Sequence, residues 1–324
     1  MRILVTGANG FIGRQLVARL LAAPPPELAG FRELVLLDLR FTNRDADPRV
    51  RYAEGSIADP GLLDAVFQSP FDLIFHLACI AGGAAEEKFD LGRQVNLEST
   101  MRLLELARRQ AAPPRIVFSS SIGVYGELPP LVTDDTPARP TWSYGTHKHI
   151  GELLMADYTR KGFVDARSLR FPGVVARPAD PSGALSAFLS DLIREVAQGR
   201  PFEIPVSPEA VSWWMSVGCC VDNVLHAATL PAAGLDAERV WMLPPLRASM
   251  HEVVDGLARV FGVPAHELVS YAPQPEIEER FGRLPEARFR RSEAMGFHND
   301  GSVDAMVRRA LAQAVEENEM EIRS

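Results

Sequence analysis

A glycine-rich turn near the start of the chain constrains the fold more than any other feature of the sequence. An apolar run from Ile3 is followed by glycines at Gly7, Gly10 and Gly13, and residues 11–23 form an amphipathic run. This order predicts a strand, a tight turn and a helix. Gly7 would permit the turn, Gly10 would let a ligand approach the backbone, and Gly13 would let the helix pack on the strand. The free amides and positive dipole end of such a helix are typical of a pyrophosphate site.

The second half of this signal is an acid at the end of the next strand. Residues 33–38 predict a buried parallel strand that ends at Asp38. A carboxylate at that place accepts hydrogen bonds from the adenosine ribose and repels a 2′-phosphate, which favours NAD over NADP. Arg40 is close enough in sequence to weaken that preference. The alternative is that Asp38 is simply a solvated strand end.

Composition and charge set the broad class of the protein. The chain has 324 residues and a formal net charge of -8. A chain of this length can bury a full core, and we expect it to hold two sub-domains. The acidic balance argues against nucleic-acid and membrane partners, and we expect no signal peptide before the strand that starts at Arg2. Three cysteines, Cys79, Cys219 and Cys220, lack the spacing of a disulfide framework or a metal site. We therefore expect a cytoplasmic protein without a metal.

Strand and helix patterns alternate through the first half of the chain and become irregular in the second half. This predicts an α/β protein with a Rossmann-like, doubly wound parallel sheet and a smaller C-terminal substrate lobe. The expected NAD-binding domain covers residues 1–172, with a returning segment at about 217–245. The expected substrate lobe covers residues 173–216 and 246–324, and it includes a terminal helix over about 302–319.

A tyrosine and a lysine stand four residues apart in a predicted helix. Tyr144 and Lys148 would share one face of that helix, where the ammonium lowers the pKa of the phenol so that it can act as a general base. Ser121 closes the preceding strand and could hydrogen-bond the reacting oxygen, whereas Ser119 and Ser120 more simply satisfy backbone groups. Asn96, inside a predicted helix, either satisfies a backbone group or anchors a water path to Lys148.

Together these residues resemble the extended short-chain dehydrogenase/reductase family, the NAD-dependent epimerase/dehydratase group, over essentially the whole chain. The resemblance implies a catalytic triad of Ser121, Tyr144 and Lys148. Ser56 replaces the acid usual beside the adenine. The cofactor positions that the resemblance and the glycine turn imply are Gly7, Gly10, Phe11, Ile12, Gly13, Asp38, Ser56, Ile57, Leu77, Ala78, Asn96, Tyr144, Lys148 and Pro172.

Finer similarity points to the D-erythronate dehydrogenase subgroup. The segments that carry it are residues 76–92, 133–136, 143–145 and 157–165. The resemblance implies NAD-dependent oxidation of a small sugar acid at C2, D-erythronate to 2-dehydro-D-erythronate. The expected substrate-binding residues are Ser121, Ala81, Gly82, Gly83 and Arg177.

Two other functions stay open on the sequence. Nucleotide-sugar 4-epimerases and dehydratases carry an Asn where this chain has Gly173, and they hold the diphosphate with an Arg in a stretch that here has no Lys or Arg between Arg200 and Arg239. A buried diphosphate without a cation would cost several kcal/mol, although Arg177 could substitute. A catalytically silent NAD-sensing protein is the third possibility. The intact Ser121, Tyr144 and Lys148 argue against it.

The resemblance also implies a homodimer in which two helices pair with their copies. These are the predicted helices over residues 97–109 and 144–160. Both carry apolar residues at helical spacing, which we expect to exceed what one sheet face needs. They are Leu103, Leu104 and Ala107 on the first helix and Leu153, Leu154 and Met155 on the second. Among the histidines, His76 is expected in the core, and His147 and His149 on the surface.

Overall fold

The computed structural model describes residues 1–178 and 185–311, which form two compact units. The first unit comprises Met1–Glu127, Thr136–Phe171 and Val221–Met242. The rest of the described chain forms the second unit, which includes Leu128–Asp135, a segment that the sequence placed in the NAD-binding domain. The end of the expected terminal helix, beyond residue 311, lies outside the described residues.

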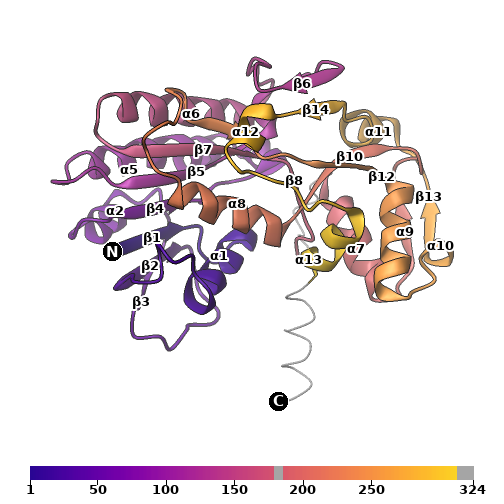
Figure 1. Ribbon diagram of the computed structural model, residues 1–324, viewed down its shortest axis with the longest axis horizontal. Helices are drawn as coiled ribbons and strands as arrows, with labels where there is room; N and C mark the ends of the chain where they lie inside the picture. Colours follow the sequence, from indigo (N-terminus) through magenta and orange to yellow (C-terminus); the bar gives the residue numbers. More distant parts are fainter. Residues whose placement is uncertain (179–184, 312–324) are drawn as a thin grey trace. The chain divides into compact units, whose positions relative to one another are not determined.

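The first unit is built on a seven-stranded sheet in which every strand is parallel to its neighbours (Figure 1). The strand order is β11-β7-β5-β4-β1-β2-β3, so the order reverses on the two sides of β1. This confirms the predicted doubly wound parallel sheet. The strands are β1 (Arg2–Thr6), β2 (Glu33–Asp38), β3 (Val50–Glu54), β4 (Leu73–His76), β5 (Arg115–Ser121), β7 (Asp165–Phe171) and β11 (Val240–Met242).

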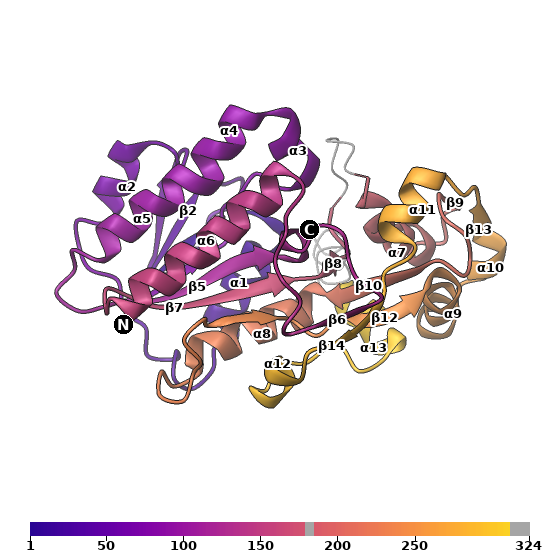
Figure 2. The same cartoon turned by 90° about the horizontal axis from the view of Figure 1, so that it is seen from above.

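Helices cover both faces of this sheet (Figure 2). On one face, α2 (Pro60–Val66), α5 (Ser99–Ala107) and α6 (Ser143–Arg160) pack on buried strand residues. On the other face lie α1 (Phe11–Ala22) and α8 (Val217–Thr229). Because the strands are parallel, the loops that follow them emerge at one edge of the sheet, where open α/β folds bind their ligands.

The apolar residues that the sequence assigned to a dimer surface are mostly core. Three side chains of α5 are fully buried against the sheet: Leu103, Leu104 and Ala107. Met155 of α6 is buried in the same core cluster. That interpretation of these four side chains is wrong, because one helix layer on the sheet needs all of them. Leu154 is half-buried, and Leu153 has 58% of its surface exposed.

The helix predicted over residues 97–109 is the end of a longer helical segment that is not continuous. It consists of α4 (Phe89–Arg93), a π-helical segment η1 (Gln94–Glu98) and then α5. Asn96 lies in this segment, and the Ser99 and Thr100 hydroxyls donate to the carbonyls four residues earlier. A π-helical turn places one extra residue in the helix, and it turns the Asn96 side chain to the neighbouring loop.

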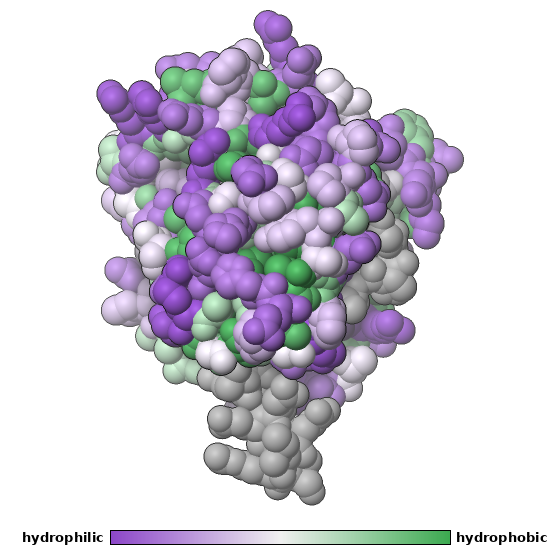
Figure 3. Space-filling view, turned by 90° about the vertical axis from the view of Figure 1, so that its right-hand side faces the viewer, coloured by the Kyte–Doolittle hydropathy of each residue, from purple (hydrophilic) through white to green (hydrophobic). Residues whose placement is uncertain are grey.

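The second unit has small sheets and several short helices around its own apolar core. The core side chains include Leu192, Trp214, Val254 and Met306. A three-stranded sheet has the order β12-β10-β8, and the face of this unit seen in Figure 3 is mainly hydrophilic. The elements are β6 (Leu131–Thr133), β8 (Gly173–Val175), α7 (Ala187–Ala197), β9 (Phe202–Ile204), β10 (Val211–Ser216), β12 (Leu246–Ser249), α9 (Met250–Phe261), α10 (Ala265–Leu268), β13 (Val269–Tyr271), α11 (Pro275–Phe281), β14 (Glu286–Arg288), α12 (Arg290–Ala294) and α13 (Val303–Ala310).

None of the helices in the described part of the chain combines the length and hydropathy needed to span a bilayer.

Candidate active site

The glycine turn after β1 is as tight as the sequence predicts. Gly7 has φ +70, and a Cβ there would lie 2.8 Å from the amide nitrogen of Ala78. A Cβ on Gly13 would lie 2.1 Å from the Gly7 carbonyl oxygen, so α1 can approach the turn only with glycine at this position. Gly10 caps α1 without a side chain, and the first turn of α1, from Phe11 and Ile12, holds no acid. The first amides of α1 are therefore left for an anion.

Asp38 ends β2 beside this turn. One carboxylate oxygen accepts the Asn9 amide at 2.8 Å, and the other accepts the Leu39 amide at 2.7 Å. The Asn9 side chain in turn donates to the Arg40 carbonyl oxygen. Each carboxylate oxygen has a second lone pair, so Asp38 can still accept hydrogen bonds from a ribose. These contacts hold the carboxylate at the glycine turn.

The loops after β3 and β4 complete this edge of the first unit. Ser56 is half-buried and its hydroxyl accepts the Ala58 amide, whereas Ile57 packs in the core. Leu77 donates its amide to the Thr6 carbonyl oxygen, and Ala78 donates to the Thr6 hydroxyl. The loop after β3 is thus held by a local hydrogen bond, and the loop after β4 is held by two hydrogen bonds to the end of β1.

A buried histidine lies behind the loop after β4. The His76 ring bridges the hydroxyls of Thr6 and Thr100 at 2.8 Å and 2.9 Å. Burial, together with the charge of Lys148, lowers the pKa of His76 to about 3. A neutral ring then serves as a structural link between β1, β4 and α5. This confirms the expectation that His76 is a core residue.

Tyr144 and Lys148 lie on one face of α6, as their spacing predicts. The Lys148 ammonium is 5.7 Å from the centroid of the Tyr144 ring and 4.9 Å from that of Phe118. It donates to the carbonyl oxygen and the hydroxyl of Ser119, and it is 3% exposed. Burial lowers the pKa of Lys148, while Cys79 and Glu152 oppose that shift. The cation is therefore held close to the tyrosine in a buried position.

Ser121 meets the start of α6 through a close backbone contact that the sequence analysis missed. A Cβ on Gly145, next to Tyr144, would lie 2.1 Å from the Gly123 carbonyl oxygen. The Ser121 hydroxyl accepts the Gly123 amide at 3.1 Å. The Trp142 indole donates to the same Gly123 carbonyl. The turn after β5 and the first turn of α6 are therefore pressed together. Gly145 beside the tyrosine was the signal in the sequence.

A second missed feature is a buried ion pair behind the site. Arg170, near the end of β7, donates to both carboxylate oxygens of Glu152 at 2.8 Å and 2.7 Å. Burial raises the pKa of Glu152, but the hydrogen bonds from Arg170, His149 and Ser120 outweigh it, so the pKa is lowered. Ser120 thus bonds a carboxylate and not a backbone group. Because Glu152 lies one turn after Lys148, the pair fixes this part of α6 to the sheet.

Three of the predicted substrate residues lie where the loop after β4 enters α3 (Gly82–Glu87). Ala81 precedes the first turn, Gly82 has φ +46, and Gly83 has open space where a Cβ would be. A Cβ on Gly82 would contact the Trp142 ring at 3.9 Å, so this loop lies beside the start of α6.

Asn96 supports the loop after β4. Its contacts distinguish between the two roles considered for it, a bond to a backbone group and a water path to Lys148. Its side-chain oxygen accepts the Ile80 amide at 2.7 Å, and its side-chain nitrogen donates to the Ile80 carbonyl at 2.9 Å. Both ends of the amide therefore satisfy backbone groups, which favours the structural reading over a water path to Lys148.

Two predicted positions belong to the second unit. Pro172 directly follows β7. Arg177 is half-buried, and one of its guanidinium nitrogens donates to the Ser186 hydroxyl at 3.1 Å. Its role toward a substrate stays a prediction.

The surface assignment of His147 is wrong. Its side chain is buried beside Phe89, with ring centroids 6.4 Å apart, and burial lowers its pKa. It lies one residue before Lys148 and so faces the α4 side of α6. His149 is half-buried and contacts Glu152 at 3.3 Å.

These donors fit a dinucleotide. The uncapped first amides of α1 suit a pyrophosphate, and the Asp38 carboxylate at the same turn suits a ribose. Comparison with known proteins agrees with this arrangement, because a model of the NAD dependent epimerase/dehydratase family matches residues 3–241. This chain belongs to that family. The prediction of an NAD-dependent enzyme of the extended short-chain dehydrogenase/reductase type is confirmed.

Individual relatives align with nearly the whole length of this epimerase/dehydratase family member. It is 38% identical to the D-erythronate dehydrogenase of Cupriavidus necator over 97% of this chain and 99% of the relative. It is 33% identical to the D-erythronate dehydrogenase of Haemophilus influenzae over 96% of this chain and 99% of that relative. The nucleoside-diphosphate-sugar epimerase structure from Agrobacterium tumefaciens is 31% identical, with a TM-score of 0.90 and coverage of 98% and 95%.

Proposed function

We propose that this protein oxidises a small sugar acid at C2 with NAD, and that its substrate is D-erythronate. The observation that carries the proposal is the placement of Tyr144 and Lys148 on one face of α6, against the turn that follows Ser121. The similarity to two D-erythronate dehydrogenases over almost the full chain supports the substrate.

The chemistry assigns a separate task to each of these side chains. A bound NAD would supply the acceptor for the hydride that leaves C2. Tyr144 takes the proton of the C2 hydroxyl as its general base, so that the alcohol becomes a carbonyl. The buried Lys148 ammonium stabilises the phenolate. The Ser121 hydroxyl donates a hydrogen bond to the same substrate oxygen.

The cofactor would be held by the residues at the carboxyl edge of the first unit. The first amides of α1 would bind the pyrophosphate and Asp38 the adenosine ribose. Ser56 and Ile57 would lie beside the adenine, and Ala78 along the cofactor. The remaining cofactor positions keep the roles that the family resemblance implies: Gly7, Gly10, Phe11, Ile12, Gly13, Leu77, Asn96 and Pro172.

A nucleotide-sugar 4-epimerase is the second candidate, favoured by the likeness to the Agrobacterium tumefaciens structure. The chain offers little for a diphosphate, since it has Gly173 at the family's Asn position and no Lys or Arg between Arg200 and Arg239. The two functions differ in a simple readout. An epimerase returns its hydride and accumulates no NADH.

The experiment is a substrate screen of the purified protein with NAD. D-erythronate, related four- to six-carbon aldonates, uronates and UDP-sugars are each offered, and both NADH and the carbon product are measured. We expect NADH release with D-erythronate or a close relative only. UDP-sugar interconversion without NADH would instead establish the epimerase.

We also propose a cytoplasmic homodimer. Exposed apolar side chains on α4, α5 and α6 favour it: Phe89 is 54%, Met101 47% and Leu153 58% exposed. The three free cysteines suit a reducing compartment. Light scattering at micromolar concentration should give the dimer mass, and a monomer mass would contradict the proposal.

A further inference from the structure

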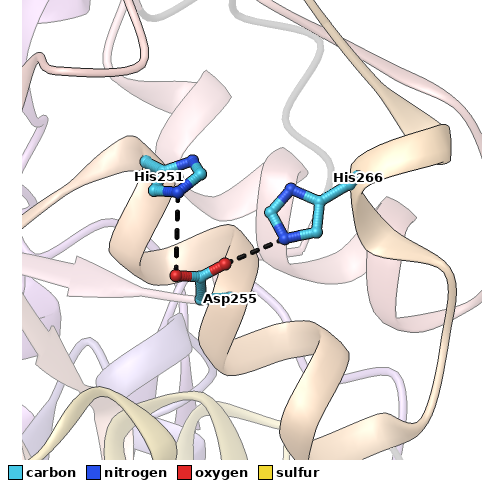
Figure 4. A group of neighbouring side chains, drawn as sticks. All are labelled: His251, Asp255 and His266. Atoms are coloured by element: carbon cyan, nitrogen blue, oxygen red, sulfur yellow. Dashed lines mark ion pairs between the residues drawn. The ribbon is translucent and has the colours of Figure 1, made fainter.

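Three metal-binding side chains converge on the surface of the second unit. His251 and Asp255 lie one turn apart on α9, and His266 lies in the first turn of α10 (Figure 4). The His266 Nε2 atom is 2.8 Å from one carboxylate oxygen of Asp255, and the His251 Nε2 atom is 3.8 Å from the other. One ligand atom from each residue lies within 4.8 Å of the other two.

The backbone that carries these residues is fixed by strong local signals. α9 begins with a capping box between Ser249 and Glu252, and it ends at Gly262, which has φ 67. α10 is anchored by Ala265, which is fully buried in the core of the second unit. Both elements are therefore held in place independently of the cluster, so that binding needs only side-chain adjustment.

The donor set has the chemistry of a transition-metal site. Two imidazole nitrogens and one carboxylate oxygen are common ligands of zinc, at bonds of about 2.0–2.2 Å. Around a tetrahedral ion such ligands stand about 3.3 Å apart, which lies between the shortest and longest separations in this cluster. The two histidine rings have centroids 5.4 Å apart and do not stack, so both edges can turn to one ion.

Access and charge also suit an ion. The side chains of His251, Asp255 and His266 are 58%, 36% and 53% exposed, so a hydrated cation can reach them and keep water as a fourth ligand. As ion pairs alone, contacts at this exposure would stabilise the fold little. One carboxylate facing two imidazole nitrogens is better explained by a shared ligand.

We propose that His251, Asp255 and His266 bind one zinc ion, which joins α9 to α10 within the second unit. The signal in the sequence was a histidine and an acid four residues apart on a helix, with a second histidine fifteen residues after the first. The expectation of a protein without a metal rested on the spacing of the cysteines.

The test is a calorimetric titration of the metal-free protein with zinc chloride, at mildly alkaline pH because imidazole binds metals in its neutral form. We expect one zinc per chain and a rise in the thermal unfolding midpoint. His266→Gln and Asp255→Asn should each weaken binding at least about tenfold and abolish that rise.

Glu267→Gln is the matched control, since it removes an exposed carboxylate next to His266 but outside the cluster. It should leave zinc affinity unchanged. Circular dichroism of the metal-free variants verifies that each is folded. No binding, or binding that survives both ligand substitutions, would overturn the proposal. Zinc binding is read without NAD or substrate, so its failure is distinct from failure of the proposed reaction.

Discussion

The two units of the molecule differ in how their polar groups are arranged. At the carboxyl edge of the first unit, close backbone contacts shape the glycine turn beside Asp38, and the carbonyl and hydroxyl oxygens of Ser119 hold Lys148. The second unit has a core that includes Trp214, and most of its ion pairs lie on the surface. Among the contacts described, Arg177 of this unit bonds only a serine hydroxyl. In the first unit, close backbone contacts thus fix the groups expected to serve the cofactor and the proton, whereas Arg177 of the second unit is held by a side-chain hydrogen bond.

Tyr144→Phe gives the largest effect and tests the proton chemistry assigned to the first unit. Turnover should fall about a hundred- to ten-thousand-fold, because only the hydroxyl carries the proton, whereas NAD affinity should hold. Steady-state kinetics and calorimetry measure the two. Tyr158→Phe is the control, because Tyr158 lies at the far end of α6 and bonds Glu105. Near-normal turnover of Tyr144→Phe would break the assignment.

Arg177→Ala tests the second unit directly. If Arg177 anchors the acid group, the Michaelis constant for the sugar acid should rise about ten- to a hundredfold, since a hydrogen bond to a charged group contributes about 1.5–3 kcal/mol. The constant for NAD should barely move. An unchanged constant for the acid would leave the hydroxyl and backbone donors of Ser121 and Ala81 to Gly83 as the anchor.

Asp38→Ser tests cofactor selection at the first unit's edge. Loss of the carboxylate removes its repulsion of a 2′-phosphate, so the preference for NAD over NADP should fall about tenfold. The ratio of kcat/KM for the two cofactors measures it. A wild-type enzyme that prefers NADP would show that Asp38 has another role.

Gly13→Ala asks whether the backbone contact itself matters. The added Cβ would meet the Gly7 carbonyl oxygen, so the free energy of unfolding should fall by about 1–3 kcal/mol and NAD binding should weaken. Gly30→Ala, whose Cβ would meet nothing within 4 Å, is the control. Chemical denaturation measures both, and equal stabilities would sink the argument for a rigid turn.

The His76→Gln variant changes the pH dependence of stability, and it concerns the support of that edge. The folded pKa is lowered to about 3, whereas an unfolded imidazole titrates near 6.5. The unfolded state therefore binds more protons between these values. The stabilisation that the neutral His76 ring gives the folded state is fully present above about pH 6.5. As pH falls toward 3 it is lost, and the free energy of unfolding decreases by roughly 1.4 kcal/mol per pH unit. The variant should lack this slope in denaturation curves, and an unchanged slope would assign it to other groups.

Much of the first unit and little of the second could be predicted from the sequence. The glycine turn, Asp38 and the Tyr144–Lys148 spacing could be predicted because each is a local pattern with one backbone solution. The π-helical segment at Asn96 could not, since the Asn96 side chain bonds the backbone of Ile80 in another loop and no local pattern shows that contact. The Glu152–Arg170 pair could not be predicted either, because it joins residues on different elements. The short strands of the second unit offer too few residues for a periodic signal.

The most direct test of the account is the yield of NADH from D-erythronate. One NADH should form for each 2-dehydro-D-erythronate produced, and both should disappear together in Tyr144→Phe. Formation of an epimerised UDP-sugar with no NADH, and no reaction of any sugar acid, would contradict the proposed oxidation.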